Sequence, residues 1–281
     1  MRNARFLLVA TLMAGAANGA VLQYAKRATA LMDLELPTGD GPFPVFIAVH
    51  GGGWESGSRS DALPFCRVVV AAGFACAAID YRLAPAFRLP AQLEDVRDAL
   101  AFLRSNSHRL RLRTDRIILA GESAGGHLAA LTAVQTVGGG IAGVAAFSTP
   151  FDLETLAAPG QPLHVVPDQM AKVLGIAGWS PDSMARLRAA SPMLLLTGNS
   201  PPFLVIRGSD DQLVPAGQAQ AFCERAGSLA VPCSLVTVSG AKHLLWGETE
   251  VGRFEAQWHD QLLHWARTLG TAPQGVPMAG H

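Results

Sequence analysis

The residues with the clearest chemical potential form the segment Gly121-Glu-Ser-Ala-Gly125, which places a serine between two nearby glycines. A serine hydroxyl is a weak nucleophile at neutral pH, so it attacks a carbonyl only with help from a base and oxyanion donors. Gly-x-Ser-x-Gly alone is weak evidence, but an apolar run at 116–120 precedes it and a helical pattern at 127–134 follows it. This context predicts a tight strand-to-helix turn that presents Ser123 as the nucleophile, with glycines where side chains would clash.

A second motif, His50-Gly51-Gly52-Gly53, follows another apolar run at 45–49. Glycines let the backbone approach a substrate oxygen with free N–H groups. We expect the N–H groups of Gly52, Gly53 and Ala124 to form an oxyanion hole, and His50 to hold the loop. A phosphate-binding loop is the alternative, but this loop has neither the Gly-x-Gly-x-x-Gly pattern nor a P-loop Lys-Ser/Thr.

The base and the acid should follow the serine in the order acid, then histidine. The histidines after Ser123 are His127, His164, His243, His259, His264 and His281. Only His243 follows a predicted strand in a turn, so we expect His243 to be the base; His127 should point into packing. The acid follows the predicted strand at 203–206, where Asp210 and Asp211 are neighbours. The pattern leaves both open, because either carboxylate could instead cap the turn.

Apolar strand patterns alternate with helical patterns along most of the chain. This alternation predicts right-handed crossovers and an α/β fold, with a mostly parallel sheet covered by helices on both faces. The predicted strands are 31–36, 45–49, 74–79, 116–120, 141–147, 203–206 and 233–238. The predicted helices are 62–72, one that opens at Pro90, 127–134, 216–226 and a final helix with an apolar stripe from Phe254 to Leu269.

The segment of about 151–200 breaks this alternation, because it is rich in Pro, Gly and Ser and has only short helical patterns at 169–174 and 182–190. We expect it to form a small cap over the site. The predicted organisation is therefore a hydrolase domain at 21–270 with this cap insertion, followed by a flexible tail at 271–281.

Composition favours a packed globular protein, since 49% of the residues are hydrophobic and 16% are charged. The net charge of zero predicts no nucleic-acid partner. Residues 1–20 start with Arg2 and Arg5, continue with an apolar run and end in small residues. This layout is typical of a signal peptide, so we expect a periplasmic or secreted protein without stable membrane insertion after cleavage. The alternatives are an N-terminal helix that covers part of the fold and an uncleaved anchor.

The four cysteines, Cys66, Cys76, Cys223 and Cys233, show no Cys-x-x-Cys or zinc-like spacing. We expect them to be buried free thiols, with one internal disulfide as the alternative. Histidine, aspartate and glutamate also lack metal-ligand spacing, so we predict neither a metal nor another cofactor.

Five motifs occur in a characteristic order: His50-Gly-Gly-Gly-Trp54, Asp80-Tyr-Arg-Leu-Ala-Pro85, Leu89-Pro-Ala-Gln-Leu-Glu-Asp95, Gly121-Glu-Ser-Ala-Gly-Gly126 and Pro201-Pro-Phe-Leu-Val-Ile206. Together they resemble the α/β-hydrolase esterases related to hormone-sensitive lipase, and most of all the acetyl-xylan/feruloyl esterase-like (BD-FAE-like) carboxylesterases. In that family the acid lies three residues after a strand-end glycine and three before a valine. Counting from Gly208 and from Val214, the resemblance implies that Asp211 is the acid.

We therefore expect a serine carboxylesterase that cleaves short-acyl esters through an acyl-enzyme, with a small-molecule or oligosaccharide ester as its substrate. The resemblance implies acetyl or feruloyl esters of plant polysaccharide. The alternatives are an amidase, formamidase or peptidase with the same triad, a non-catalytic binding homologue, and a lipase for long acyl chains.

Overall fold

The computed structural model describes residues 19–136, 138–157, 165–178 and 180–269 of the 281-residue chain. Within these residues, eight strands form one central sheet with the order β1-β2-β4-β3-β5-β6-β7-β8. Neighbouring strands from β4 to β8 are parallel, while β1 and β2 are antiparallel at one edge. The strands are β1 (Gly19–Gln23), β2 (Leu31–Glu35), β3 (Phe43–Val49), β4 (Ala75–Ile79), β5 (Leu112–Glu122), β6 (Ile141–Phe147), β7 (Phe203–Gly208) and β8 (Cys233–Val238). The predicted mostly parallel sheet is confirmed.

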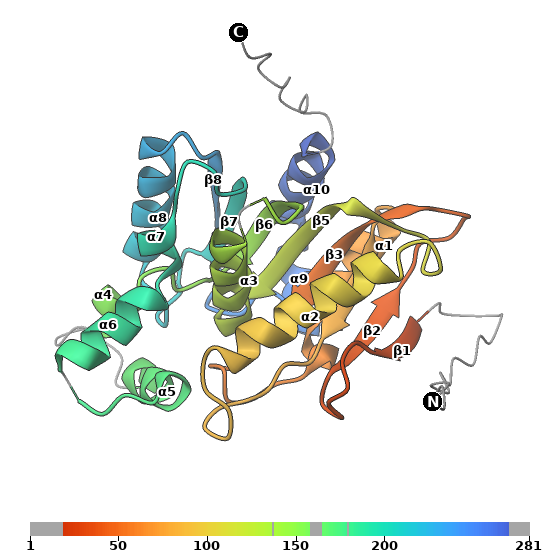
Figure 1. Ribbon diagram of the computed structural model, residues 1–281. Helices are drawn as coiled ribbons and strands as arrows, with labels where there is room; N and C mark the ends of the chain where they lie inside the picture. The colour runs from red at the N-terminus through yellow and green to blue at the C-terminus, as the bar shows by residue number, and fades with distance from the viewer. Residues whose placement is uncertain (1–18, 137, 158–164, 179, 270–281) are drawn as a thin grey trace, which may run out of the picture.

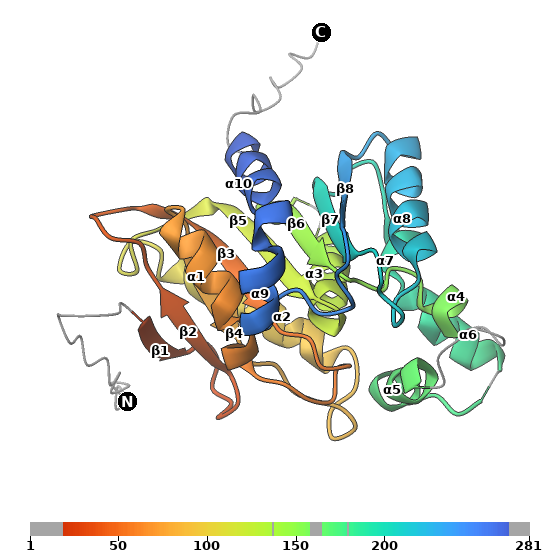
Figure 2. The same ribbon diagram turned by 180° about the vertical axis from the view of Figure 1, so that it is seen from behind.

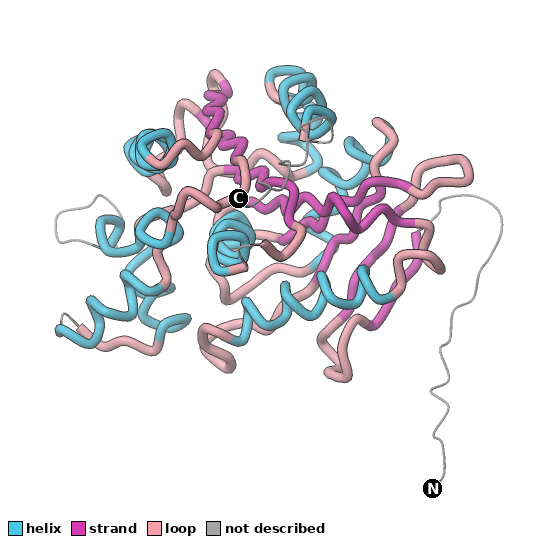
Figure 3. The backbone as a smooth tube through the Cα atoms, turned by 45° about the horizontal axis from the view of Figure 1, so that its top comes forward, coloured by secondary structure: helices cyan, strands magenta, loops and turns pink. Residues whose placement is uncertain are grey.

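Helices cover both faces of this sheet. They are α1 (Leu63–Ala71), α2 (Ala91–Ser105), α3 (Ala124–Gln135), α8 (Ala216–Ser228), α9 (Glu248–Phe254) and α10 (His259–Thr268). Helices α2, α3 and α8 pack on one face, which Figure 1 shows from the front, and α1, α9 and α10 pack on the other (Figure 2). In Figure 3 the strands form a twisted layer between the two sets of helices. The predicted α/β fold is confirmed.

The continuous apolar run of β3 explains why this sheet is buried on both sides. Val45, Ile47 and Val49 belong to the core on the side of α2 and α3. Phe46 and Ala48 belong to the core on the side of α1 and α10. Successive side chains of a strand point to opposite faces, so an unbroken apolar run suits a strand that is covered twice.

The segment between β6 and β7, which we call the insertion, interrupts the alternation of strands and helices. It contains α4 (Leu153–Ala157), α5 (Val165–Leu174), α6 (Pro181–Ala189) and α7 (Pro192–Leu195). In both views α4, α5 and α6 lie together at one end of the molecule, at the lower left of Figure 1. Ser180 starts α6 by accepting the Ser183 N–H at 3.1 Å, and Pro181 stands at the first helical position, where its missing N–H costs nothing.

The final helix differs from its prediction, because it is not continuous. Helix α9 ends at Phe254, a 3₁₀ turn occupies Glu255–Gln257, and α10 starts at His259. Phe254 and Trp258 are both buried in the same core. The 3₁₀ turn keeps these apolar side chains on the buried side, so the helical spacing of apolar residues continues through it. The apolar stripe in the sequence therefore does not show that the helix is interrupted.

Strand β1 was not predicted. Of its five residues, Gly19 to Gln23, only Leu22 is buried, because the strand lies at the sheet edge and pairs only with β2. An exposed edge strand has no apolar alternation for a pattern to detect.

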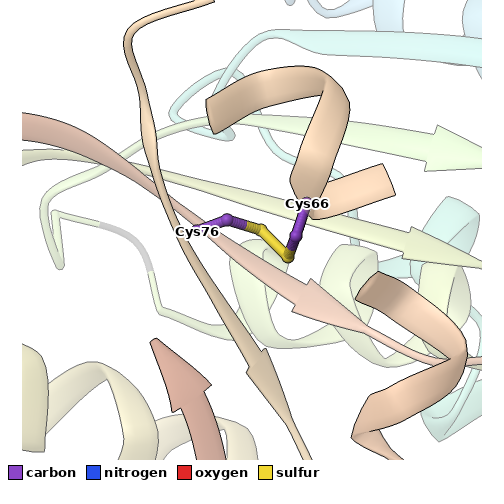
Figure 4. The surroundings of a disulfide bond; sticks show 2 residues. All are labelled: Cys66 and Cys76. Atoms are coloured by element: carbon purple, nitrogen blue, oxygen red, sulfur yellow. A yellow bond between two sulfur atoms is a disulfide. The ribbon is translucent and has the colours of Figure 1, made fainter. Parts of the chain in front are cut away.

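The prediction of free cysteines is wrong. Disulfides join Cys66 to Cys76 and Cys223 to Cys233. The first connects α1 to the following strand β4 (Figure 4), and the second connects α8 to the following strand β8. Cys66 and Cys76 are buried, as expected, whereas Cys223 and Cys233 are partly buried. Each pair is separated by ten positions, and this repeated spacing is the signal that could have shown the pairing.

Several predictions concern residues outside the described part of the chain. These are residues 1–18 of the predicted signal peptide, the predicted tail at 271–281, and His164 in the expected cap. Gly19 and Ala20, the last two residues of the predicted signal segment, begin β1. In the described residues, every helix is too short or too polar to cross a membrane.

We expect the double variant Cys66→Ala/Cys76→Ala to lose about 3 kcal/mol of unfolding free energy, because the disulfide restricts a loop of about ten residues in the unfolded chain. Urea unfolding of the variant and of the oxidised protein measures the difference, and the fully reduced protein should lose at least as much. Alkylation of all four cysteines in the folded, unreduced protein would contradict the two disulfides.

Candidate active site

Ser123 occupies the turn between β5 and α3 in a backbone conformation that few residues adopt. Its φ is +55°, in the left-handed region, which is costly for a side chain other than glycine. The turn is held because the Ser123 N–H donates to the Phe147 carbonyl at 2.8 Å and the His127 N–H donates to the Ser123 carbonyl at 2.9 Å. A Cβ at Gly121 would overlap the backbone of Gly125, so the predicted clash explains the glycine.

Ser123, His243 and Asp211 form one chain of hydrogen bonds. The Ser123 Oγ lies 2.8 Å from Nε2 of His243, and Nδ1 of His243 lies 2.9 Å and 3.0 Å from the two carboxylate oxygens of Asp211. With its proton on Nδ1, the imidazole donates to Asp211 and accepts the serine hydroxyl through Nε2. The structure therefore brings the three predicted side chains together in the geometry of a nucleophile, a base and an orienting acid.

The environment of Asp211 keeps its carboxylate charged. Burial opposes ionisation, but the hydrogen bond and charge of His243 and the N–H groups of Val214 and Leu213 outweigh it, so the pKa of Asp211 is lower than usual. Asp210 instead accepts a hydrogen bond from the Ser209 hydroxyl at 2.7 Å on the surface. Of the two aspartates that the pattern left open, Asp211 is the one that contacts His243.

The loop of residues 50–53, which we call the glycine loop, lies beside this triad and has backbone N–H groups without an acceptor in the described part of the chain. Among the hydrogen bonds of the described residues, none uses the N–H groups of Gly52, Gly53 or Ala124. Gly52 has a φ of +106°, and a Cβ there would overlap the Ser56 carbonyl, so the loop requires glycine at this position. Ala124 is the first residue of α3, where N–H groups are free and the helix dipole favours negative charge.

Two aromatic residues fix the start of the loop. The ring of His50 stacks on Tyr81 with centroids 4.2 Å apart, and Nδ1 of His50 lies 2.7 Å from the Gly51 carbonyl. The Tyr81 hydroxyl donates to the His50 carbonyl at 3.1 Å. Burial lowers the pKa of His50, which keeps its imidazole neutral. The structural role expected for His50 agrees with these contacts.

Glu122, the residue before the serine, is a functional candidate that sequence reasoning missed. One oxygen of its buried carboxyl group accepts the N–H of Leu245 and, at 2.9 Å, that of Trp246, so Glu122 holds the segment directly after His243. Burial raises the pKa of Glu122 to about 7, against the opposing effects of these N–H groups and His243. A charged residue at the end of an apolar strand was the signal that could have identified it.

The other histidines after Ser123 that the structure describes form no hydrogen bond with the triad side chains. His127 is fully buried in α3, where Nδ1 accepts the indole N–H of Trp54 at 3.2 Å and Nε2 lies 2.7 Å from the Ala190 carbonyl. His259 and His264 lie on α10, while His164 and His281 are outside the described residues. Within the described part of the chain, no three His, Cys, Asp or Glu side chains are grouped to bind a metal ion.

Comparison with known proteins identifies relatives of this chain. The family model BD-FAE matches residues 32–225, a region that includes Ser123, the glycine loop and Asp211 but ends before His243. Esterase LipC of Mycobacterium tuberculosis is 34% identical over 197 residues, which are 66% of this chain and 48% of LipC. The chain thus spans about half the length of this curated relative.

Two solved structures share the fold. A truncated carbohydrate esterase from gut microbiota aligns with a TM-score of 0.76 at 21% identity, over 90% of this chain and 95% of that chain. Thermogutta terrifontis esterase 2 phosphonylated by sarin aligns with a TM-score of 0.77 at 21% identity, over 92% of this chain and 97% of that chain.

We expect the protein to lose stability as the pH falls from about 6.5 to about 4, in part because of His127. Burial lowers the pKa of His127 from 6.5 to about 4. Between these values the unfolded chain binds a proton that the folded protein excludes, so acid favours unfolding. The contribution is on the order of 3 kcal/mol, complete above pH 6.5 and lost as the pH approaches 4. Urea unfolding between pH 7 and pH 4 measures it, and His127→Phe should show a shallower decline. Parallel declines in both proteins would disprove this assignment.

Proposed function

The chain belongs to the BD-FAE family, and on that premise we propose that it is a serine carboxylesterase with Ser123 as its nucleophile. The observation that carries the proposal is the hydrogen-bond chain from Ser123 through His243 to Asp211, next to the unused N–H groups of the glycine loop. The esterase names of LipC and of the structural relatives also support ester hydrolysis.

In the first half of the reaction, Ser123 Oγ attacks the ester carbonyl carbon while Nε2 of His243 takes the hydroxyl proton. The carbonyl oxygen becomes an oxyanion, which accepts hydrogen bonds from the N–H groups of Gly52, Gly53 and Ala124. Asp211 stabilises the imidazolium through Nδ1. The imidazolium then gives its proton to the alcohol oxygen, the ester C–O bond breaks, and the acyl group remains on Ser123.

In the second half, water replaces the alcohol. His243 takes a proton from this water as its oxygen attacks the acyl carbon, and the same N–H groups bind the new oxyanion. The proton then returns to Ser123 Oγ as the acyl–oxygen bond breaks. The acid is released and the triad regains its starting protonation.

We assign short-acyl esters as the substrate class, with acetyl or feruloyl esters of plant polysaccharide as the specific candidates. Support comes from the family match and from the carbohydrate esterase in the fold comparison. Long acyl chains fit less well, because the helices in the described part of the insertion have at most ten residues.

We further assign the protein to the periplasm or the extracellular space. The support is the signal-like segment at 1–20 together with two disulfides, which persist in oxidising compartments. Fractionation of the source cells tests this assignment, and protein confined to the reducing cytosol would overturn it.

Ser123→Ala and His243→Ala should each lower kcat for p-nitrophenyl acetate roughly a million-fold, because the nucleophile and its base act as one unit. Asp211→Asn should lose about ten-thousand-fold, since an amide cannot stabilise the imidazolium. Steady-state kinetics with matched circular dichroism spectra measures these losses, and labelling of wild type by a fluorophosphonate reports the acyl-enzyme site directly.

The matched control for the acid is Asp210→Asn, which changes the neighbouring carboxylate that accepts the Ser209 hydroxyl. It should retain activity within about threefold, as expected for an exposed carboxylate that is not part of the hydrogen-bond chain of the triad. A large loss in Asp210→Asn with little loss in Asp211→Asn would move the acid by one residue.

A substrate panel tests the acyl preference. Acetyl and butyryl p-nitrophenyl esters should be cleaved with a higher kcat/KM than decanoyl esters, and acetylated or feruloylated xylo-oligosaccharides should release free acid. Matched acetanilides should react far more slowly than the acetyl esters. Faster turnover of the anilides would instead favour an amidase with the same triad.

A further inference from the structure

Trp54, the residue directly after the glycine loop, has an unusual backbone conformation. Its φ is +62°, in the left-handed region that a bulky side chain rarely adopts. Trp54 is 2% exposed, and its carbonyl accepts the Ala84 N–H at 2.8 Å. Such a conformation persists only where surrounding contacts hold it, so the partners of Trp54 determine where Gly52 and Gly53 point.

The side-chain partner of Trp54 is His127, one helical turn beyond Ser123. The indole N–H donates to Nδ1 of His127 at 3.2 Å, and the rings meet edge to face with centroids 5.1 Å apart at 86°. Both side chains are buried, so this hydrogen bond has no competition from water. It connects the end of the glycine loop to the helix that begins with the nucleophile turn.

The other nitrogen of His127 connects the same imidazole to the insertion. Nε2 lies 2.7 Å from the carbonyl oxygen of Ala190, at the C-terminal end of α6. A carbonyl oxygen only accepts, so Nε2 carries the proton and Nδ1 has a free lone pair. That is the tautomer required to accept the Trp54 N–H. The Ala190 carbonyl of the insertion therefore sets the tautomer of His127, and this tautomer accepts the Trp54 N–H.

We propose that His127 is a positioning residue for the oxyanion donors, through which the end of α6 fixes the conformation of the glycine loop. This inference rests on the proposed esterase function. The imidazole of His127 hydrogen-bonds to Trp54 and Ala190 rather than to the triad side chains; it acts through Trp54 on the N–H groups of Gly52 and Gly53. Because burial also lowers its pKa to about 4, the imidazole stays neutral at ordinary working pH.

A second contact between the insertion and the loop is weaker. The side-chain amide of Gln169 packs on Gly53, and Lys172 pairs with Glu55 at 2.8 Å. The Lys172 and Glu55 side chains are 37% and 25% exposed. Partly solvated ion pairs contribute little, whereas the buried hydrogen bonds of His127 have a fixed direction. The His127 contact is therefore the one that can set the angle of the N–H groups.

The role predicts a particular kinetic signature. Oxyanion donors act mainly on the transition state, so a misdirected loop lowers kcat while substrate binding changes little. Trp54→Phe removes the indole donor, and His127→Phe removes both hydrogen bonds of the imidazole. We expect each variant to lower kcat roughly tenfold to a hundredfold with KM within about threefold, since donors displaced by about an ångström lose much of their effect.

The double variant Trp54→Phe/His127→Phe separates a shared pathway from two independent ones. It should be no slower than the slower single variant, because both substitutions break the same connection. Thr132→Val is the matched control, since Thr132 is also fully buried in α3 and its hydroxyl has no partner among the described residues. This control should keep kcat and KM unchanged. The proposal would be overturned if the fold-decreases in kcat of the two single variants multiplied in the double variant. It would also be overturned if the single variants changed only the melting temperature.

A measurement on the unmutated protein does not depend on the variants folding. The ¹⁵N spectrum of His127 should show a protonated Nε2 and an unprotonated Nδ1, and the indole N–H of Trp54 should be protected from exchange. The opposite tautomer would overturn the proposal. Failure of the esterase function gives a different result, because wild type would then not turn over esters, whatever the tautomer of His127.

Discussion

The close approach of α3 to the end of β3 is the constraint on which the rest of the site depends. A side chain at Gly125 would overlap the carbonyl groups of Val49 and His50, so only glycine allows the two backbones to come this close. The contact places Ser123 and the first N–H groups of α3 beside the loop that begins at His50. The candidate nucleophile and donors thus come from two βα units, and a backbone contact sets the distance between them.

A second glycine has the same role at the other side of the site. A Cβ at Gly208 would overlap the carbonyls of Ala241 and Lys242, so β7 ends directly against the turn that precedes His243. Asp211 lies three residues after Gly208, which brings the carboxylate to the imidazole without a long flexible connection. Packing of the backbone, rather than attraction between the side chains, therefore assembles the hydrogen-bonded triad.

Sequence patterns predict those parts of the site whose information is local. Ser123 and His243 each follow an apolar strand, and parallel strands end at one edge of a sheet, so the strand order is not needed to bring them near each other. Asp210 and Asp211 share one strand end, so the pattern cannot separate them. The partners of Glu122 lie 123 and 124 positions away, and no local signal specifies which distant group a buried polar side chain meets.

Two buried polar side chains near Ser123 connect the turn between β5 and α3 to opposite parts of the site. Glu122 holds the backbone just after His243, and His127 holds Trp54 beside the candidate donors. Burial of both groups is costly, as the raised pKa of Glu122 and the lowered pKa of His127 indicate. An apolar pair would avoid this cost, but apolar contacts have no direction and would leave the two loops free to tilt. Because both loops are attached to the same turn, a small shift of the turn moves nucleophile, base and donors together and preserves their mutual geometry.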